Sequence, residues 1–340
     1  LGDYAYIYVE PELEGKLFSA EENQGDGSLG AWKNYGGAKT WPAPQGWDNE
    51  QQWHGPPDPV LDTGRYQVTD FRATEDEAAI EMVSPPDPRT GLQITRRLTL
   101  RRGSSRLTID LSFTNISDRT TRWSIWDVTQ VRAEQIGEDG SLQPDTSCLV
   151  TAPLNPDSRH ARGFDVMFGD EDNPQWQAET ESGLFVGRYL NKVGKVSLDS
   201  PGGWIAFANQ SMGNALVERF TVDPDAEYPD DGATVECWTT GTGIVGNLNF
   251  EDRKIYHMET EVLSPLHTFE PGTRHAFQIE WGVCKLPGRV TDVQAGGCTF
   301  EALRLGRQAE DEVRVQGIFG VFDGAEARLI AKDRDGVEKS

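Results

Sequence analysis

The stretch Leu92–Thr114, LQITRRLTLRRGSSRLTIDLSFT, decides the class of fold. Apolar and polar residues alternate on both sides of Gly103-Ser104-Ser105, which is the period of a strand with one buried face. The stretch therefore predicts two antiparallel strands, Leu92–Arg101 and Arg106–Thr114, joined by a tight turn. Similar runs between turn residues predict further strands at Tyr4–Val9, Ala79–Val83, Arg122–Val131, Gly183–Tyr189, Trp204–Asn209, Leu216–Val222, Thr234–Trp238, Tyr256–Leu263 and His275–Cys284.

No segment shows a helical period of useful length, so the 340 residues predict an all-β chain larger than one immunoglobulin domain. A Pro-Gly turn at 287–288 suggests a division into residues 1–286 and 287–340. Short strands near Val290–Val293, Val313–Val321 and Ala327–Ala331 follow it. This C-terminal extension is either the start of an immunoglobulin-like domain or a set of extra strands on the main body.

The composition argues against nucleic acid and membranes as binding partners. With 55 acidic and 32 basic residues the formal charge is −23, and such a surface repels nucleic acid and anionic lipid. The chain has no apolar run long enough for a membrane-spanning helix, so we expect no membrane insertion. A run of arginines is expected to scatter over an exposed strand face rather than form a basic patch: Arg96, Arg97, Arg101, Arg102 and Arg106.

Four cysteines occur without a CxxC spacing, so a zinc ribbon or redox motif is not supported. The chain starts at Leu1, and we expect an exported protein from which a leader was removed, or a piece of a longer precursor. In an exported protein Cys284 and Cys298, which flank the Pro-Gly turn, are the favoured disulfide pair. Cys148 and Cys237 would then pair by elimination, and buried free thiols are the alternative.

A segment rich in tryptophan and proline, Tyr35–Tyr66, carries the first functional signal. Its prolines predict an ordered loop rather than a helix or central strand. Indole rings beside polar side chains suit a sugar, whose C–H face stacks on an aromatic ring while its hydroxyls take hydrogen bonds. The candidate sugar-binding residues here are Lys39, Trp41, Gln45, Trp47 and Trp53. The alternative is that these tryptophans only plug the end of a β-sandwich.

Several segments together resemble a known superfamily: Asn115-Ile-Ser-Asp118, Trp126-Asp-Val-Thr-Gln130, Val235-Glu-Cys-Trp238, Glu261-Val-Leu-Ser-Pro-Leu266 and the Lys39-Thr-Trp-Pro-Ala-Pro-Gln45 loop. Over about residues 5–285 the chain is similar to the galactose mutarotase-like, aldose 1-epimerase-type superfamily, nearest to its uncharacterised bacterial DUF4380 type. The resemblance implies a large antiparallel β-supersandwich with a carbohydrate site on a concave sheet face. It implies either epimerase-type acid–base chemistry or binding alone.

The resemblance also assigns roles to residues of this chain. A late glutamate acts as general base in the epimerases, and Glu261 lies in the comparable segment, with Glu236 or Glu259 as weaker alternatives. The strand that delivers a catalytic histidine there carries Asp127 here, so the expected catalytic residues are Glu261, Asp127 and His54. On the same strands Trp126, Gln130, Glu236 and Trp238 are expected to bind substrate.

No histidine pair has the spacing of a metal site, and the acidic loops at 169–173 and 223–231 are interpreted as solvated turns. We therefore expect no metal and no cofactor. Two alternatives to an epimerase-type or sugar-binding protein stay open. One is a polysaccharide lyase using His54, Tyr66, Arg65 and Arg97, and the other is a non-catalytic extracellular assembly subunit. The sequence leaves the sugar and the oligomeric state open.

Overall fold

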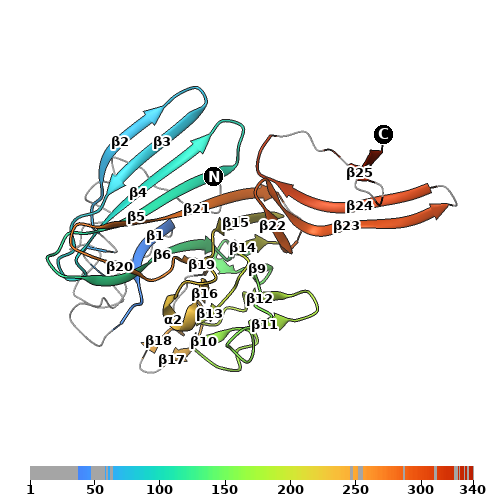
Figure 1. Cartoon of the computed structure of the whole chain (residues 1–340). Helices are drawn as coiled ribbons and strands as arrows, with labels where there is room; N and C mark the ends of the chain where they lie inside the picture. The colour runs from blue at the N-terminus through green and yellow to red at the C-terminus, as the bar shows by residue number, and fades with distance from the viewer. Residues whose placement is uncertain are drawn as a thin grey trace.

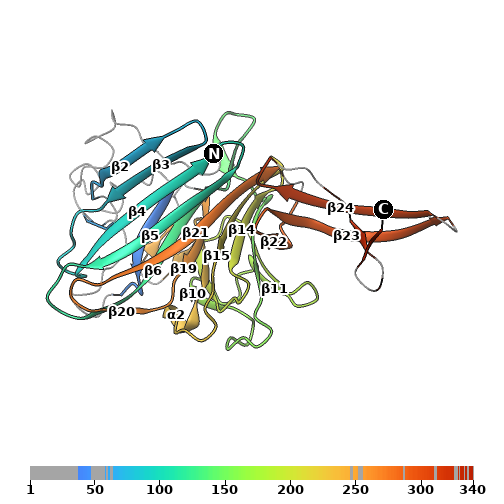
Figure 2. The same ribbon diagram turned by 45° about the horizontal axis from the view of Figure 1, so that its top comes forward.

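A computed structural model describes residues 37–46, 58, 60–61, 64–245, 248–251, 256–285, 288–309, 312–324, 328, 330–332, 334 and 337–339. Within these ranges the chain is built almost entirely of antiparallel strands, which confirms the all-β prediction. Two large sheets pack face to face, as Figures 1 and 2 show. The predicted strand Tyr4–Val9 lies outside the described residues.

The larger sheet has ten strands in the order β11-β12-β9-β14-β15-β21-β5-β4-β3-β2. In that order the strands are Trp176–Glu179, Leu184–Arg188, Cys148–Pro153, Trp204–Asn209, Asn214–Phe220, Arg274–Lys285, Arg106–Asn115, Leu92–Arg101, Glu77–Val83 and Gln67–Ala73. The predicted hairpin is confirmed as β4 and β5, with Leu98 opposite Ile109. Ile94, Ile109 and Phe113 are fully buried, as the alternation requires.

The smaller sheet has seven strands in the order β1-β6-β19-β16-β13-β10, with β20 also paired to β6. These strands are Gly37–Ala43, Thr121–Arg132, His257–Leu263, Val235–Thr239, Gly194–Leu198, Asp165–Phe168 and His267–Phe269. The prediction that the segment from Tyr35 is all loop is wrong in part, because β1 belongs to it. Pro42 is tolerated there because β1 is an edge strand of the sheet.

The only helix among the described residues is α2, Pro229–Gly232, and Asp230 and Asp231 in it have left-handed φ angles of 49° and 57°. Short two-stranded pieces complete the fold: β7 (Glu134–Ile136) with β8 (Leu142–Pro144), and β17 (Ile244–Val245) with β18 (Leu248–Asn249). None of the described helical residues forms a segment long and apolar enough to cross a membrane.

The C-terminal residues add a three-stranded sheet of β22 (Asp292–Gln294), β23 (Gly297–Ala309) and β24 (Glu312–Val321), and the small pair β25 (Ala331–Lys332) and β26 (Glu338–Lys339). β23 and β24 run away from the body as a long ribbon in both ribbon views. At its base Val290, Val293 and Phe322 share a second apolar cluster with residues of the ten-stranded sheet. Whether this extension is a separate domain stays a prediction.

All four cysteines are buried free thiols, so both expected disulfides are wrong and the alternative of buried free thiols is confirmed. Cys284 and Cys298 are neighbours, as the prediction placed them, with sulfur atoms 3.5 Å apart and no bond between them. Gly320 lies against both thiols, because a Cβ atom built there would be 2.3 Å from the Cys284 sulfur.

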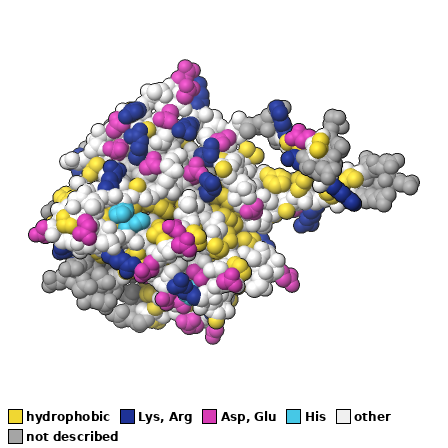
Figure 3. All heavy atoms as spheres, viewed as in Figure 1, with side chains coloured by type: hydrophobic (Ala, Val, Ile, Leu, Met, Phe, Trp, Pro, Cys, Tyr) yellow, Lys and Arg dark blue, Asp and Glu magenta, His cyan; other side chains and the backbone are white. Residues whose placement is uncertain are grey.

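Acidic and basic side chains are interspersed on the face shown in Figure 3. Arg97 pairs with Asp70, Arg101 with Glu77 and Arg106 with Asp323. Arg102 pairs with Glu75, whereas Arg96 reaches the backbone carbonyl of Ala38 and faces buried Asp127. The predicted scatter of arginines is therefore confirmed except at Arg96, and these residues form no basic patch.

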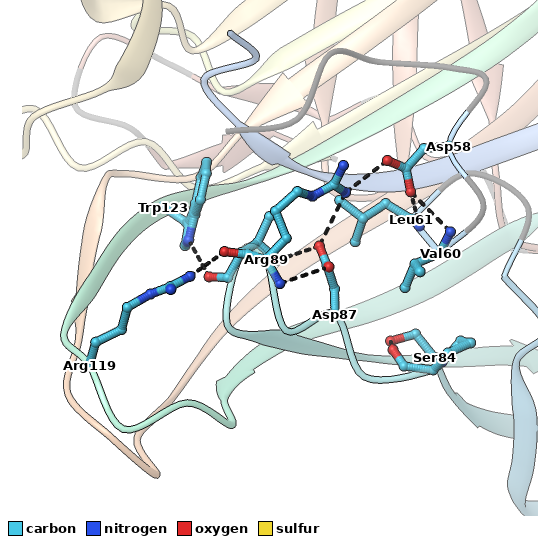
Figure 4. Close-up of polar contacts among 10 residues, drawn as sticks. Asp58, Val60, Leu61, Ser84, Asp87, Arg89, Arg119 and Trp123 are labelled. Atoms are coloured by element: carbon cyan, nitrogen blue, oxygen red, sulfur yellow. Dashed lines mark hydrogen bonds and ion pairs between the residues drawn. The ribbon is translucent and has the colours of Figure 1, made fainter. Parts of the chain in front are cut away.

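An ionic network fixes the end of the tryptophan-rich segment (Figure 4). Asp58 accepts hydrogen bonds from the backbone of Val60 and Leu61 and pairs with Arg89 at 2.7 Å. Arg89 also pairs with Asp87, at the turn that leads into β4. Arg89 therefore joins this end of the segment to the turn before β4.

Candidate functional site

Cross-strand pairing on the seven-stranded sheet brings polar side chains from five strands into two rows. Because successive residues of a strand point to opposite faces, directly paired residues share a face. One row contains Ser197, Glu236, Glu261, Val128 and Lys39. The next row on the same face contains Phe168, Lys195, Trp238, Glu259 and Gln130. We call this the glutamate face.

Two glutamates lie directly opposite each other at its centre. Glu236 on β16 pairs with Glu261 on β19, and their exposed fractions are 1% and 0%. Like charges directly opposite in a sheet are destabilising, and burial adds to the cost. Such a costly arrangement is typical of a functional site rather than of a sheet selected only for stability.

Lys195 on β13 holds the two carboxylates together. Its ammonium lies 2.7 Å from Oε2 of Glu236 and 3.0 Å from Oε2 of Glu261. The same ammonium is 4.3 Å from the ring centre of Trp126, a cation–π contact. Trp126 in turn donates its indole N–H to Oε2 of Glu261 at 2.8 Å. Glu261 is thus held from two sides.

Burial changes the proton affinity of the groups at the centre of the glutamate face. Burial raises the pKa of Glu261 well above its usual range, and the carboxylates of Glu236 and Glu259 add to the rise while Lys195 opposes it. For Lys195 burial works against the charge, but Glu236 and Glu261 outweigh it and raise its pKa. Two opposed carboxyl groups, one of them with a strongly raised pKa, are an arrangement suited to general acid–base catalysis.

Asp230 adds a third carboxyl group to the cluster. Burial, with the nearby Glu236 carboxylate, raises its pKa to about 7. It lies in the α2 turn, where its left-handed φ angle is unusual for a residue with a side chain. Strained backbone that persists in a fold is concentrated at functional sites, and here it presents an acid to Glu236.

A second polar group extends the face toward β1. Gln130 donates its amide N–H to Oε1 of Glu259 at 2.6 Å, and His257 lies 3.4 Å from the same oxygen. Burial opposes ionisation of Glu259, but the contact with His257 and the bond from Gln130 outweigh it and hold its pKa below the usual value. Glu259 and Glu261, two residues apart on one strand, therefore have opposite pKa shifts.

Aromatic rings lie at both ends of the glutamate face. Trp41 packs edge-on against Trp126 with ring centres 5.5 Å apart, and Lys39 lies 5.6 Å from the Trp41 ring. At the other end Trp238 contacts Phe168 at 5.2 Å and Phe250 at 6.4 Å. Phe168 and Trp238 are partly exposed, so this end of the face reaches solvent.

Asp127 does not share the glutamate face, and that expectation is corrected. It follows Trp126 in β6 and therefore points to the opposite side, between the sheets, where Thr40 donates to it at 3.1 Å. Burial raises its pKa to about 6, although Arg96 and Thr40 oppose the rise. Glu218 of the ten-stranded sheet faces the same layer and accepts a short hydrogen bond from Thr260.

The structure thus brings together seven of the residues expected from the sequence: Lys39, Trp41, Trp126, Gln130, Glu236, Trp238 and Glu261. Gln45 is exposed just beyond β1. Trp47, Trp53 and His54 lie outside the described residues, so their roles stay predictions.

Sequence reasoning missed Lys195 and Asp230. Lys195 stands alone among apolar residues in the segment Gly194–Leu198, GKVSL, and a lone lysine in a strand is a weak signal of a buried ion pair. Asp230 belongs to an acidic turn interpreted as solvated, and only the fold places it beside Glu236. Among the residues that the structure describes, no group of three or more His, Cys, Asp or Glu side chains is arranged to hold a metal ion.

Comparison with solved structures gives distant neighbours. A galactose mutarotase-like protein from Lactobacillus casei aligns with 10% identity and a TM-score of 0.44, over 74% of this chain and 86% of that one. A second, from Clostridium acetobutylicum, aligns with 12% identity and a TM-score of 0.42, over 74% and 80%. A TPR-domain containing protein from Parabacteroides distasonis shares 12% identity with a TM-score of 0.48, over 83% of this chain and 42% of that one.

The architecture follows from the two large antiparallel sheets of this chain, which match the β-sandwich that the resemblance implies. No family model and no curated protein sequence matches the chain. The narrower DUF4380 assignment therefore stays a prediction.

Proposed function

We propose that the protein binds a carbohydrate on the glutamate face and transfers protons to and from it with Glu236 and Glu261. The observation that carries the proposal is the buried, directly opposed pair of these glutamates held by one lysine. The cluster offers acceptors for the hydroxyls of a sugar, and the partly exposed Trp238 beside it offers an aromatic face for the ring.

The two carboxyl groups suit different steps of anomer exchange. Opening a sugar ring requires a proton donor to the ring oxygen and an acceptor for the proton of the anomeric hydroxyl. Glu261, whose pKa burial raises well above its usual range, is the donor, in place of the base role that the resemblance implies. Glu236, which makes the shorter ion pair with Lys195, is the acceptor. Closure of the ring on its other face with the reverse transfers gives the other anomer and restores both groups.

Anomer exchange measured by proton NMR with a panel of reducing sugars tests the proposal. We expect faster exchange with the protein, and at least a tenfold loss in Glu261→Gln and in Glu236→Gln. The exposed loop substitution Asp172→Asn is the control and keeps the wild-type rate. Exchange that is no faster than in buffer, or that survives both glutamine variants, contradicts the catalytic part.

A second candidate is a sugar-binding protein without catalysis. It is favoured by Lys195, which contacts both carboxylates and thereby reduces their freedom to exchange protons. Saturation transfer to a sugar without faster anomer exchange supports this candidate. The lyase alternative has less support, because Arg97 pairs with Asp70 and Tyr66 faces Arg96 and Asp127 in the layer between the sheets.

A further inference from the structure

The glutamate face carries more carboxyl groups than cationic groups, even with Lys39 counted at its edge. Four carboxyl groups, those of Asp230, Glu236, Glu259 and Glu261, interact with the one ammonium of Lys195. Two of them already contact this ammonium directly. Among the described residues, His257 makes its ion-pair contact with Glu259. A ligand that brings a positive charge would therefore relieve repulsion, and one that brings a negative charge would add to it.

The same face holds buried acceptor atoms without a partner. Among the described residues, Oε1 of Glu236 and Oε1 of Glu261 have no donor outside the carboxyl groups of the cluster itself, and Oε1 of Gln130 has none. The hydroxyl of Ser197, directly opposite Glu236, also has no partner within the described ranges. All four side chains are more than nine-tenths buried. A buried acceptor without a donor is costly, so this set favours a ligand rich in N–H or O–H donors.

Aromatic rings beside these acceptors favour a cation. The Trp126 ring already takes the Lys195 ammonium on its face, and Trp238 is the direct cross-strand partner of Lys195. Phe168 packs against Trp238 at the partly exposed end of the face. Carboxylates next to aromatic faces are the combination that recognises ammonium groups.

We propose that the ligand of the glutamate face is an amino sugar with a free ammonium group, preferred over neutral sugars and over uronates. The inference rests on the proposed function, since it names the sugar class for the same site. The three N–H donors of the ammonium supply the missing hydrogen bonds, and its charge offsets the excess of carboxylates. A uronate would place a further carboxylate among four and is disfavoured.

Titration calorimetry at pH 7 tests this preference with D-glucosamine and D-galactosamine, each against its N-acetyl form as the neutral match, and against D-glucuronate and D-galacturonate. We expect at least one free amine to bind tenfold or more tighter than its N-acetyl form and than either uronate. We also expect the advantage to persist in high salt, because salt screens buried charges much less than exposed ones. Repeating the titration in buffers of different ionisation enthalpy should show that binding releases protons. The ammonium of the ligand favours the ionised forms of Glu261 and Asp230, so these carboxyl groups should lose protons when it binds.

Variants and a simple amine test whether the preference for amino sugars arises at the glutamate face. Glu236→Gln and Glu261→Gln should each remove most of the preference for the amine, whereas the exposed substitution Asp172→Asn should leave it unchanged. Ethanolamine, an amine without a sugar ring, should bind at least tenfold more weakly than the amino sugar. Ethanolamine that binds as tightly as the amino sugar, or an amine preference that survives both glutamine variants, overturns the inference. Either result would mean that amines are attracted only to the acidic surface.

The failure of this inference can be told from failure of the proposed function. If N-acetylated or uronate sugars bind as tightly as the free amines, the amino-sugar preference is wrong and carbohydrate binding stands. If no sugar of the panel binds while the protein is folded by circular dichroism, both the preference and the proposed function are overturned.

Discussion

Trp126 donates its indole N–H to the same carboxylate oxygen of Glu261 that Lys195 contacts, at 2.8 Å and 3.0 Å. The two donors come from β6 and β13, on opposite sides of the strand that carries Glu261 in the sheet order. Glu261 is therefore fixed in position while its other oxygen faces no donor among the described residues outside the carboxyl groups of the cluster itself. A fixed carboxyl with one available oxygen is suited to proton transfer.

Replacing Trp126 by Phe tests the role of this indole. The ring and its packing against Trp41 are largely kept, but the hydrogen bond to Glu261 is lost. We expect about 1–3 kcal/mol lower stability and a clear loss of anomer exchange, since the buried oxygen of Glu261 loses one of its two donors. Chemical denaturation and proton NMR measure the two effects, and an unchanged exchange rate would refute the positioning role.

Replacing Lys195 by Met leaves two buried glutamates without their counter-charge. We expect a loss of about 3–5 kcal/mol in unfolding free energy at pH 8, because breaking a buried ion pair leaves uncompensated charge. The loss should be smaller at pH 5, where the glutamates can take up protons. Adding Glu236→Gln and Glu261→Gln to Lys195→Met should restore much of the stability. Equal losses at both pH values would contradict the account.

Asp127 should make the stability depend on pH between about 4 and 6. Its pKa rises from 3.8 to about 6 on folding, so the folded state keeps a proton that the unfolded chain has already lost. Stability therefore falls as pH rises through this window, by about 3 kcal/mol, and the loss is complete above it.

Asp127→Asn keeps an acceptor for Thr40 and removes the ionisation. Urea denaturation from pH 4 to 7 should show a shallower decline in this variant than in the wild type, with Asp172→Asn as the control. If the unfolding free energy of Asp127→Asn falls as steeply with pH as that of the wild type, Asp127 ionises in the folded protein without loss of stability, and the prediction is wrong.

Gly320 should be intolerant of a side chain. A Cβ atom there meets the sulfur atoms of Cys284 and Cys298 at 2.3 and 2.9 Å, so Gly320→Ala must displace the base of the ribbon. We expect about 1–3 kcal/mol lower stability and faster amide exchange in β23 and β24. Gly296, whose Cβ position has no atom within 4 Å, is the matched control. Similar behaviour of the two variants would contradict the packing described.

The strands and their pairing were largely predictable because alternation is a local signal. The hairpin β4–β5 and the strands β14, β19 and β21 follow the predicted segments within about two residues. Short strands such as β10, β11 and β13 were missed, because four or five residues carry too little period to be recognised. β1 was missed because its proline indicated a loop, which an edge strand tolerates.

The candidate site was predictable in part for the same reason. Glu236 and Glu261 stand out as carboxylates in apolar strands, but only the pairing register shows that they are opposite each other. The register also separates Asp127 from Trp126, since adjacent residues in a strand face opposite sides. Lys195 and Asp230 come from distant segments, and nothing local links them to the glutamates. Export of the chain stays a prediction.

Saturation-transfer NMR on the wild type and on the double variant Glu236→Gln/Glu261→Gln tests the central claim most directly. With the sugar panel above, the account predicts transfer from the wild-type protein to at least one sugar and its loss in the folded double variant. Equal transfer from both proteins would show that sugar binds elsewhere, and no transfer from the wild type would contradict carbohydrate binding on the glutamate face.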